Sequence, residues 1–364
     1  MNKQLLAVAL ASAVALPATA MAGDLTVYGQ AQIEVSNTSF DKDNESIDSV
    51  TEVADNARGR VGFKATEDLG GKLKGIAKME FKVDTADGDA DAACKDLEPK
   101  DTADPTGACK NTVGISITKR EMMVGLKGVF GQFEGGRLKT PYKYTGGVKY
   151  DPFVATALEA RGTAGMSGKT GKGKSMGHNG FHSNMLGWRS PNWGGFDLQA
   201  IYGVETDDGS YSVAAKWSIP VVELFVAAND DGDLASKTVS YSAVKAGGQV
   251  RLGGGNHKIS LQYEMTDLGN EADKSDPTHL FLGYDGKFGG KTHFVAQLGF
   301  ADHDNTTSTA NDSYAEVYYS VGAIYKFSKQ TRVFGGFRIT GDDIENENNA
   351  SMTWSVGIRK DFKS

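Results

Sequence analysis

Residues 211–219 read YSVAAKWSI and decide the fold class, because apolar and polar side chains alternate along them. Val213 and Trp217 fall on one face of an extended chain and Lys216 on the other, since successive side chains of a β-strand point to opposite faces. The same alternation returns in further stretches, among them residues 258–265 and 351–362. No segment keeps a helical period, so the chain is predicted to be all-β.

The polar face of these strands indicates what lies on either side of the sheet. Charge occurs in mid-strand on that face, at Lys72, Lys74, Lys78, Glu80 and Lys82. A soluble sandwich explains the apolar face alone, whereas a barrel with a wet lumen and an apolar exterior explains both faces. The strands run about ten residues, the length that a tilted strand needs to cross the hydrocarbon of a bilayer.

The links between strands alternate in length. Short links fall at residues 68–71, 128–131, 191–195, 219–222, 253–257, 286–290 and 327–330. Longer polar links fall near residues 36–56, 84–114, 140–180, 206–210, 230–237, 267–277, 301–313 and 341–350. Seven short turns and eight longer loops connect sixteen predicted strands. The sequence therefore predicts a transmembrane antiparallel β-barrel, in which closure removes every sheet edge.

The N-terminus predicts export. Lys3 precedes a short apolar core, and an A-x-A cleavage pattern ends at Ala22. Residues 1–22 are therefore predicted to be a signal peptide, and residues 23–364 a single barrel domain. The whole chain has 39 Lys and Arg against 46 Asp and Glu, a balance that argues against nucleic acid as a partner. In an oxidising compartment Cys94 and Cys109 are expected to form a disulfide, with metal binding as the weaker alternative.

Signs of enzyme or cofactor chemistry are weak. Residues 168–175 match the phosphate-binding pattern G-x-x-x-x-G-K-[ST], but they lack the preceding apolar strand and the following helix that this motif needs. The six histidines are scattered and show no zinc-binding spacing. His182 and Ser183 are adjacent, so a strand would point them to opposite faces. We expect no enzyme activity, no cofactor and no metal.

Several motifs in a fixed order resemble the Gram-negative general porins. They are DLTVYG at residues 24–29, RVGFK at 60–64, VGLKG at 124–128 and WRSPN at 188–192. The resemblance implies a homotrimer of sixteen-stranded barrels, exported through the periplasm to the outer membrane of a Gram-negative bacterium. Each barrel would be a water-filled channel for passive diffusion of ions and small hydrophilic solutes. Members of this family usually end on an aromatic residue, whereas here Lys363 and Ser364 follow Phe362.

The resemblance also implies that the third external loop, residues 140–180, folds inward and narrows the pore. Strand alternation turns six cations toward the lumen: Arg58, Arg60, Lys64, Lys74, Lys78 and Lys82. The resemblance adds Arg137, which a bulge near Gly135 would turn inward. Asp151 and Glu159 lie in the loop, so we expect a pore constriction between a basic wall and an acidic loop. Because the loop also carries several Lys and Arg, a weak anion preference is predicted.

Two alternatives remain open at this point. A substrate-specific porin for sugars, phosphate or short carboxylates would use aromatic residues, which the loop offers at Tyr142, Tyr144, Tyr150 and Phe153. A barrel with a plugged lumen would serve as an adhesin or scaffold. In every case lipid would contact the apolar exterior, and divalent cations could bridge the acidic first loop to lipopolysaccharide.

Overall fold

A computed structural model describes the wall of the molecule and part of its links. The described residues are 23–40, 47–56, 58–86, 117–167, 180–204, 209–232, 242–267, 277–302, 317–341 and 351–364. The predicted signal peptide, Cys94, Cys109 and residues 168–175 lie outside them. Among the described residues, no helix has the length and hydropathy to span a membrane.

In this part of the chain seventeen β-segments form one antiparallel sheet. In chain order they are β1 Gly23–Phe40, β2 Ile47–Ala54, β3 Arg60–Gly70, β4 Leu73–Val83, β5 Ile117–Gly128, β6 Gly131–Lys139, β7 Phe181–Arg189, β8 Phe196–Gly203, β9 Tyr211–Ser218, β10 Val222–Asp230, β11 Ser242–Leu252, β12 His257–Asp267, β13 Thr278–Phe288, β14 Thr292–Asp302, β15 Val317–Lys326, β16 Thr331–Gly341 and β17 Ser351–Lys363. Within the described residues three short helical segments accompany them: α2 Pro141–Tyr144, η2 Gly147–Lys149 and η5 Gly253–Gly255.

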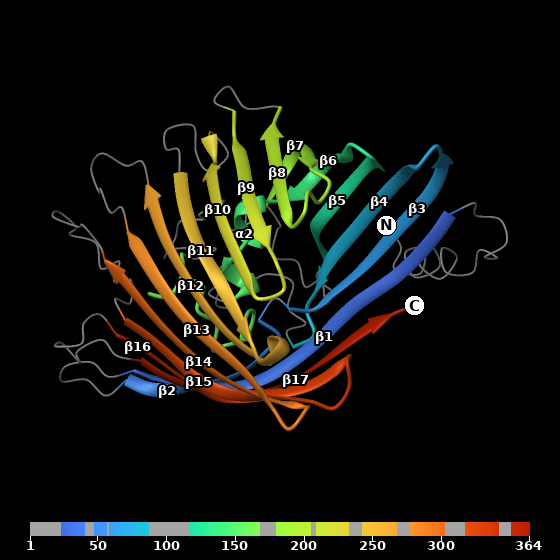
Figure 1. The fold of residues 1–364 in the computed structure, drawn as a ribbon. Helices are drawn as coiled ribbons and strands as arrows, with labels where there is room; N and C mark the ends of the chain where they lie inside the picture. The colour runs from blue at the N-terminus through green and yellow to red at the C-terminus, as the bar shows by residue number, and fades with distance from the viewer. Residues whose placement is uncertain are drawn as a thin grey trace, which may run out of the picture.

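The sheet closes on itself, as the sequence predicted. β1 pairs with β17 from Tyr28 opposite Lys363 to Phe40 opposite Ser351. On its other side the C-terminal half of β1, residues 34–40, pairs with β2 and the N-terminal half, residues 23–30, pairs with β3. β2 and β3 are therefore two parts of one wall strand, interrupted around Asp55, and the seventeen segments make a barrel of sixteen strands. Figure 1 shows this wall curving round the short helix α2.

Side-chain burial is inverted relative to a soluble protein. On β12, Leu261 is 51% exposed on the outer face, whereas its neighbour Gln262 is 1% exposed on the inner face. β17 repeats the pattern, with Trp354 and Val356 exposed and Ser355 buried between them. Large apolar side chains on the outside of nearly every strand form a surface that is stable only against lipid. This inversion confirms the predicted transmembrane barrel class.

The short turns are built for tight reversal. At the β3–β4 turn Gly70 and Gly71 have φ values of 83° and 59°, in the left-handed region that glycine adopts without steric cost. Lys72 follows with a φ of 67° and lies in this turn, before β4 begins at Leu73, so its predicted place in mid-strand is wrong. Asp68 Oδ1 accepts a hydrogen bond from Gly70 N at 2.8 Å, which fixes the start of the turn. Seven short links, of which this turn is the first, define one end of the barrel, which we call the turn end.

A charge placed on the outer face should destabilise the barrel according to its depth. Leu261 lies in the middle of β12, so Leu261→Arg is expected to lower the free energy of unfolding in lipid vesicles by about 2–4 kcal/mol, because a guanidinium would enter hydrocarbon. Denaturant titration of the vesicle-inserted protein measures this change.

Leu252→Arg is the matched control. Leu252 is equally exposed but lies at the turn end, where the expected loss is only about 0–1 kcal/mol. Equal and negligible losses at both positions would show that the outer face meets water.

Candidate functional site

Residues 140–167 leave the end of β6 and pack against the inner face of the wall. Glu264 on β12 receives hydrogen bonds from both ends of this segment: Tyr142 Oη donates to Oε1 at 2.5 Å, and Ser167 N donates to Oε2 at 3.0 Å. Gly147 N donates to Gln262 Oε1 at 2.6 Å on the same strand. Lys245 Nζ on β11 lies 4.4 Å from the centre of the Tyr142 ring, a cation–π contact. The first and last turns of the segment are thus fixed to one patch of wall.

The middle of the segment contacts β14, two strands along the wall from β12. Asp151 Oδ1 accepts from Gln297 Nε2 on β14 and from Phe153 N, both at 2.7 Å, and its Oδ2 accepts from Ala160 N at 2.9 Å. Burial raises the pKa of Asp151 to about 6, although these three donors oppose the shift. Asp151 therefore acts as an internal clamp rather than as a charge open to solution.

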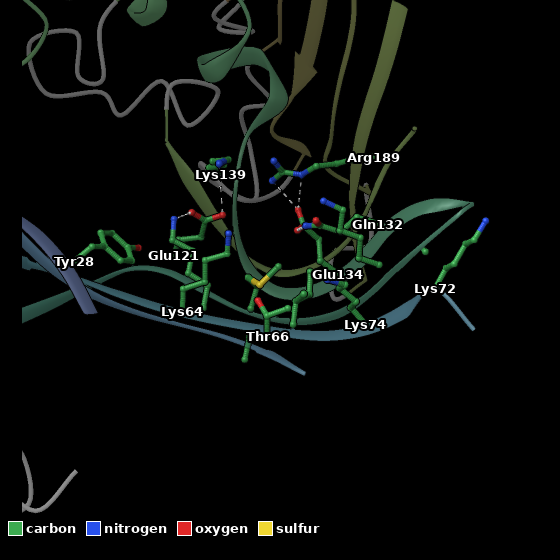
Figure 2. Close-up of a pocket in the computed structure, with 16 residues that line it drawn as sticks. Tyr28, Lys64, Thr66, Lys72, Lys74, Glu121, Gln132, Glu134, Lys139 and Arg189 are labelled. Atoms are coloured by element: carbon green, nitrogen blue, oxygen red, sulfur yellow. Dashed lines mark hydrogen bonds and ion pairs between the residues drawn. The ribbon is translucent and has the colours of Figure 1, made fainter. Parts of the chain in front are cut away.

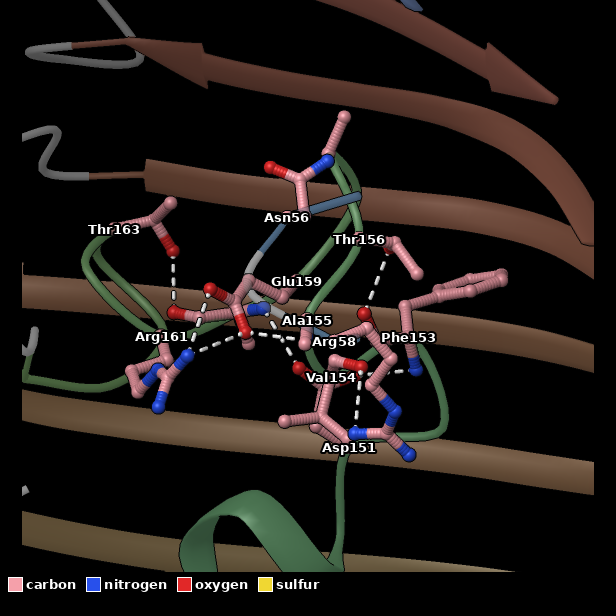
Figure 3. A network of polar contacts seen from close by, with 12 residues as sticks. Asn56, Arg58, Asp151, Phe153, Val154, Ala155, Thr156, Glu159, Arg161 and Thr163 are labelled. Atoms are coloured by element: carbon pink, nitrogen blue, oxygen red, sulfur yellow. Dashed lines mark hydrogen bonds and ion pairs between the residues drawn. The ribbon is translucent and has the colours of Figure 1, made fainter. Parts of the chain in front are cut away.

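Two further contacts hold the tip of the segment. Ala157 N donates to Glu34 Oε2 on β1 at 3.1 Å, and Tyr318 Oη on β15 donates to Leu158 O at 2.7 Å. Phe153 and Leu158 pack in an apolar cluster of the inner wall with Val295, Ile324 and Phe334. Figure 3 shows the polar contacts within the segment, where Glu159 accepts from Ala155 N at 2.7 Å and pairs with Arg161 at 3.1 Å.

A cavity of about 900 Å³ lies between this segment and the wall. Its described lining contains eleven cations and only two carboxylates, Asp151 and Asp231. The cations are Arg58, Arg60, Lys82, Lys119, Arg120, Arg137, Lys143, Lys149, Arg161, Arg332 and Arg359. Glu80 pairs with Arg60 at 3.7 Å and with Arg120 at 2.9 Å. The excess of cations makes the cavity electropositive.

The nine predicted pore residues do not all share this cavity. Arg58, Arg60, Lys82, Arg137 and Asp151 line it, and Glu159 reaches it only through Arg161. Lys64, Lys74 and Lys78 instead line a second cavity of about 560 Å³, nearer the turn end (Figure 2). The two cavities have no lining residue in common. Strand parity identified the inner face but not the depth at which each cation lies.

Arg137 lies where the expected bulge would turn it. The β6–β7 register shifts between Gly136 and Leu138, and Gly136 has a φ of 135°. This irregularity lets Arg137 line the larger cavity and donate from Nη1 to Ser183 Oγ at 3.0 Å.

Sequence reasoning missed four cations of the larger cavity: Lys119, Arg120, Arg332 and Arg359. Arg332 on β16 and Arg359 on β17 are directly opposite each other, so the sheet register places two like charges side by side. Both reach Asp361, at 3.5 and 2.7 Å. The alternation of β17 put Arg359 on the polar face, but only strand pairing could show that Arg332 joins it.

The chain matches the family model for Gram-negative porins over residues 7–345. It belongs to the Gram-negative porin family. Major outer membrane protein P.IB of Neisseria gonorrhoeae is 27% identical over 373 residues, which cover 91% of each chain. The protein of the same name from Neisseria meningitidis serogroup B, strain MC58, is 32% identical over 152 residues, which span 41% of this chain and only 37% of that protein.

Solved structures share the fold. An anion-selective porin from Comamonas acidovorans superposes with a TM-score of 0.65 and 22% identity, covering 93% of this chain and all of that one. OmpF of Salmonella typhi superposes with a TM-score of 0.63 and 14% identity, covering 93% and 97%. Family and fold together confirm the predicted resemblance and the outer-membrane location, and they point to a protein that is not an enzyme.

The role of Asp151 as a clamp can be tested by hydrogen exchange. Asp151→Asn puts an amide group where Phe153 N and Ala160 N now find carboxylate oxygens, so one buried N–H loses its acceptor. We expect exchange at Phe153 or Ala160 to accelerate by roughly 5- to 150-fold, the equivalent of about 1–3 kcal/mol for an unsatisfied buried group. The amide of Gly147, bonded to Gln262, is the internal control and should not change. Unchanged exchange at Phe153 and Ala160 as well as at Gly147 would contradict the proposed role of Asp151 as a clamp.

Proposed function

We propose that this porin forms a water-filled channel for passive diffusion of ions and small hydrophilic solutes, with a weak preference for anions. The observation that carries the proposal is the larger cavity, whose described lining has eleven cations against two carboxylates. In a pore, the sign of the lining charge decides which ion is concentrated there. The anion-selective porin from Comamonas acidovorans, which has the same fold, supports this choice.

Residues 140–167 form the constriction in this proposal, with Arg58, Arg60, Lys82 and Arg137 facing them. A transverse field between a basic wall and an acidic segment receives little support, because the carboxylates of Asp151 and Glu159 are occupied by hydrogen bonds and by Arg161. Lys143, Lys149 and Arg161 in the segment add positive charge to the same cavity. The field is better described as positive on both sides of the lumen.

The burial of aromatic residues favours general diffusion over a substrate-specific sugar channel. Tyr142, Tyr150 and Phe153 are buried in contacts with the wall, and of the four predicted aromatic candidates only Tyr144 lines the larger cavity. Three of the four therefore have no face free to stack on a sugar. A plugged adhesin or scaffold is disfavoured by the cavity volume of about 900 Å³ beside the segment.

Export and assembly complete the proposal. Residues 1–22 act as a signal peptide, residues 23–364 form a single barrel domain, and Cys94 and Cys109 form a disulfide in the second loop. The channel works as a homotrimer surrounded by outer-membrane lipid and lipopolysaccharide. OmpT of Vibrio cholerae, which shares the fold with a TM-score of 0.61 and 16% identity, is described in a trimer form, which supports this assembly.

Reversal potentials in a KCl gradient test the anion preference. The wild-type channel should prefer chloride, and Arg58→Gln should reduce the chloride-to-potassium permeability ratio by up to about fivefold, the effect of one charge at about 4 Å in water. Arg58 is suitable because, within the described residues, its side chain donates to the Val154 carbonyl and to no carboxylate.

The control is Lys360→Gln, which removes the same charge from an exposed position beside Thr331 on the outer face of β17. It should leave the permeability ratio unchanged. A wild-type channel that prefers potassium would refute the proposed selectivity.

A further inference from the structure

Three pairs of like charges face each other across the inner surface of β3, β4 and β5. The strand register places Arg60 opposite Lys82, Lys64 opposite Lys78 and Lys74 opposite Lys127. Side chains directly opposite in an antiparallel sheet lie roughly 5 Å apart at Cβ, and like charges there destabilise the pairing. This repulsion lowers the stability of the barrel, so the like-charge pairs do not serve to stabilise the fold.

Two of these pairs are relieved by carboxylates of the wall. Glu80 lies 3.7 Å from Arg60 and 3.5 Å from Lys78, and Glu121 also pairs with Lys78. Asp84 lies 3.4 Å from Lys82. At these two pairs, carboxylates therefore balance part of the positive charge.

The Lys74–Lys127 pair is different. Within the part of the chain that the structure describes, neither ammonium group forms an ion pair or a side-chain hydrogen bond, and Lys64 nearby is in the same condition. Asp68 stands opposite Lys74 on β3, but its Oδ1 is engaged by Gly70 N in the turn, and Asp68 does not line the cavity. The cavity at the turn end therefore has lysines in excess of its carboxylates.

The neighbouring strands continue this row with fixed donors. Gln132 on β6 is the register partner of Lys127, and Arg189 on β7 is the partner of Gln132. Both are fixed by Glu134, which accepts from Arg189 Nε at 3.0 Å and Nη2 at 2.8 Å and from Gln132 Nε2. Figure 2 shows Lys74, Gln132 and Arg189 around the same hollow. Because Glu134 is occupied in this way, it leaves the two lysines uncompensated.

We propose that Lys74 and Lys127, supported by Lys64, form a second anion-binding site at the turn end, selective for multivalent oxyanions such as phosphates and polycarboxylates. Two adjacent ammonium groups match two charges on one solute, whereas a chloride ion compensates only one of them. All three lysines are exposed, so binding is weak and reversible, as conduction requires. The inference rests on the proposed anion channel and adds a second site between its constriction and the turn end.

Inorganic pyrophosphate, added to one side of a single channel carrying chloride current, is the probe. We expect it to reduce the current at a lower concentration from the turn end than from the loop end, because the site opens toward the turns. The double variant K74Q/K127Q should raise the half-blocking concentration from the turn end by about two- to fivefold for each charge removed. Monovalent acetate at equal ionic strength should show no such asymmetry.

Lys287→Gln is the matched control. Lys287 on β13 stands opposite His293 near another short turn and does not line the cavity. The substitution therefore removes a charge from the inner face at the same end of the barrel but outside the proposed site. Half-blocking concentrations that are equal from both sides, or unchanged in K74Q/K127Q, would overturn the site. Reversal potentials in KCl on the same channels separate the two claims, since the anion preference from the larger cavity should persist in K74Q/K127Q.

Discussion

The closed ring of backbone hydrogen bonds, with apolar side chains outside and polar side chains inside, is the constraint on which the rest of this porin depends. In hydrocarbon an unpaired peptide group costs several kcal/mol, so a sheet can cross only if its last strand pairs with its first. β1 satisfies this condition by pairing with β17 on one side and with β2 and β3 on the other. Closure then gives every strand one face toward lipid and one toward the lumen.

The inner face serves two purposes that compete for the same side chains. Carboxylates such as Glu264 and Glu34 are consumed in holding residues 140–167 against the wall, and Glu80 and Glu121 are consumed in balancing cations. Because the acidic residues are largely committed to structure, the charges left facing the cavities are mainly Lys and Arg. A chain with more acidic than basic residues can thus present a basic lumen.

Much of the architecture was accessible from the sequence because period-two alternation is a local signal. The strands around YSVAAKWSI and the alternation of short and long links gave the barrel class and the strand number directly. The link predicted at residues 36–56 was wrong in part: residues 47–54 form β2, which continues the wall strand of β3 beyond an interruption around Asp55. The inner face of β4 was correctly assigned from Lys74, Lys78 and Lys82, since parity alone decides it.

The site was harder to predict because it depends on which strands meet. Parity could not show that Lys74 and Arg60 line different cavities, nor that Arg332 lies directly opposite Arg359 on the neighbouring strand. Asp151 appeared to be a pore charge because its three partners come from residues 2, 9 and 146 positions away in the chain. The Gln297 contact depends on where the segment meets β14 in the closed barrel, which no local pattern reveals.

A nitroxide scan of β4 in lipid vesicles tests the central claim most directly. Single labels at residues 73–83 would be probed with oxygen, which concentrates in hydrocarbon, and with a water-soluble nickel chelate. Accessibility to oxygen should peak at the odd positions, such as Met79, and accessibility to nickel at the even positions, such as Lys74 and Lys78. Nickel access at every position, without a two-residue period, would mean that both faces of the sheet meet water and would contradict a membrane-spanning barrel.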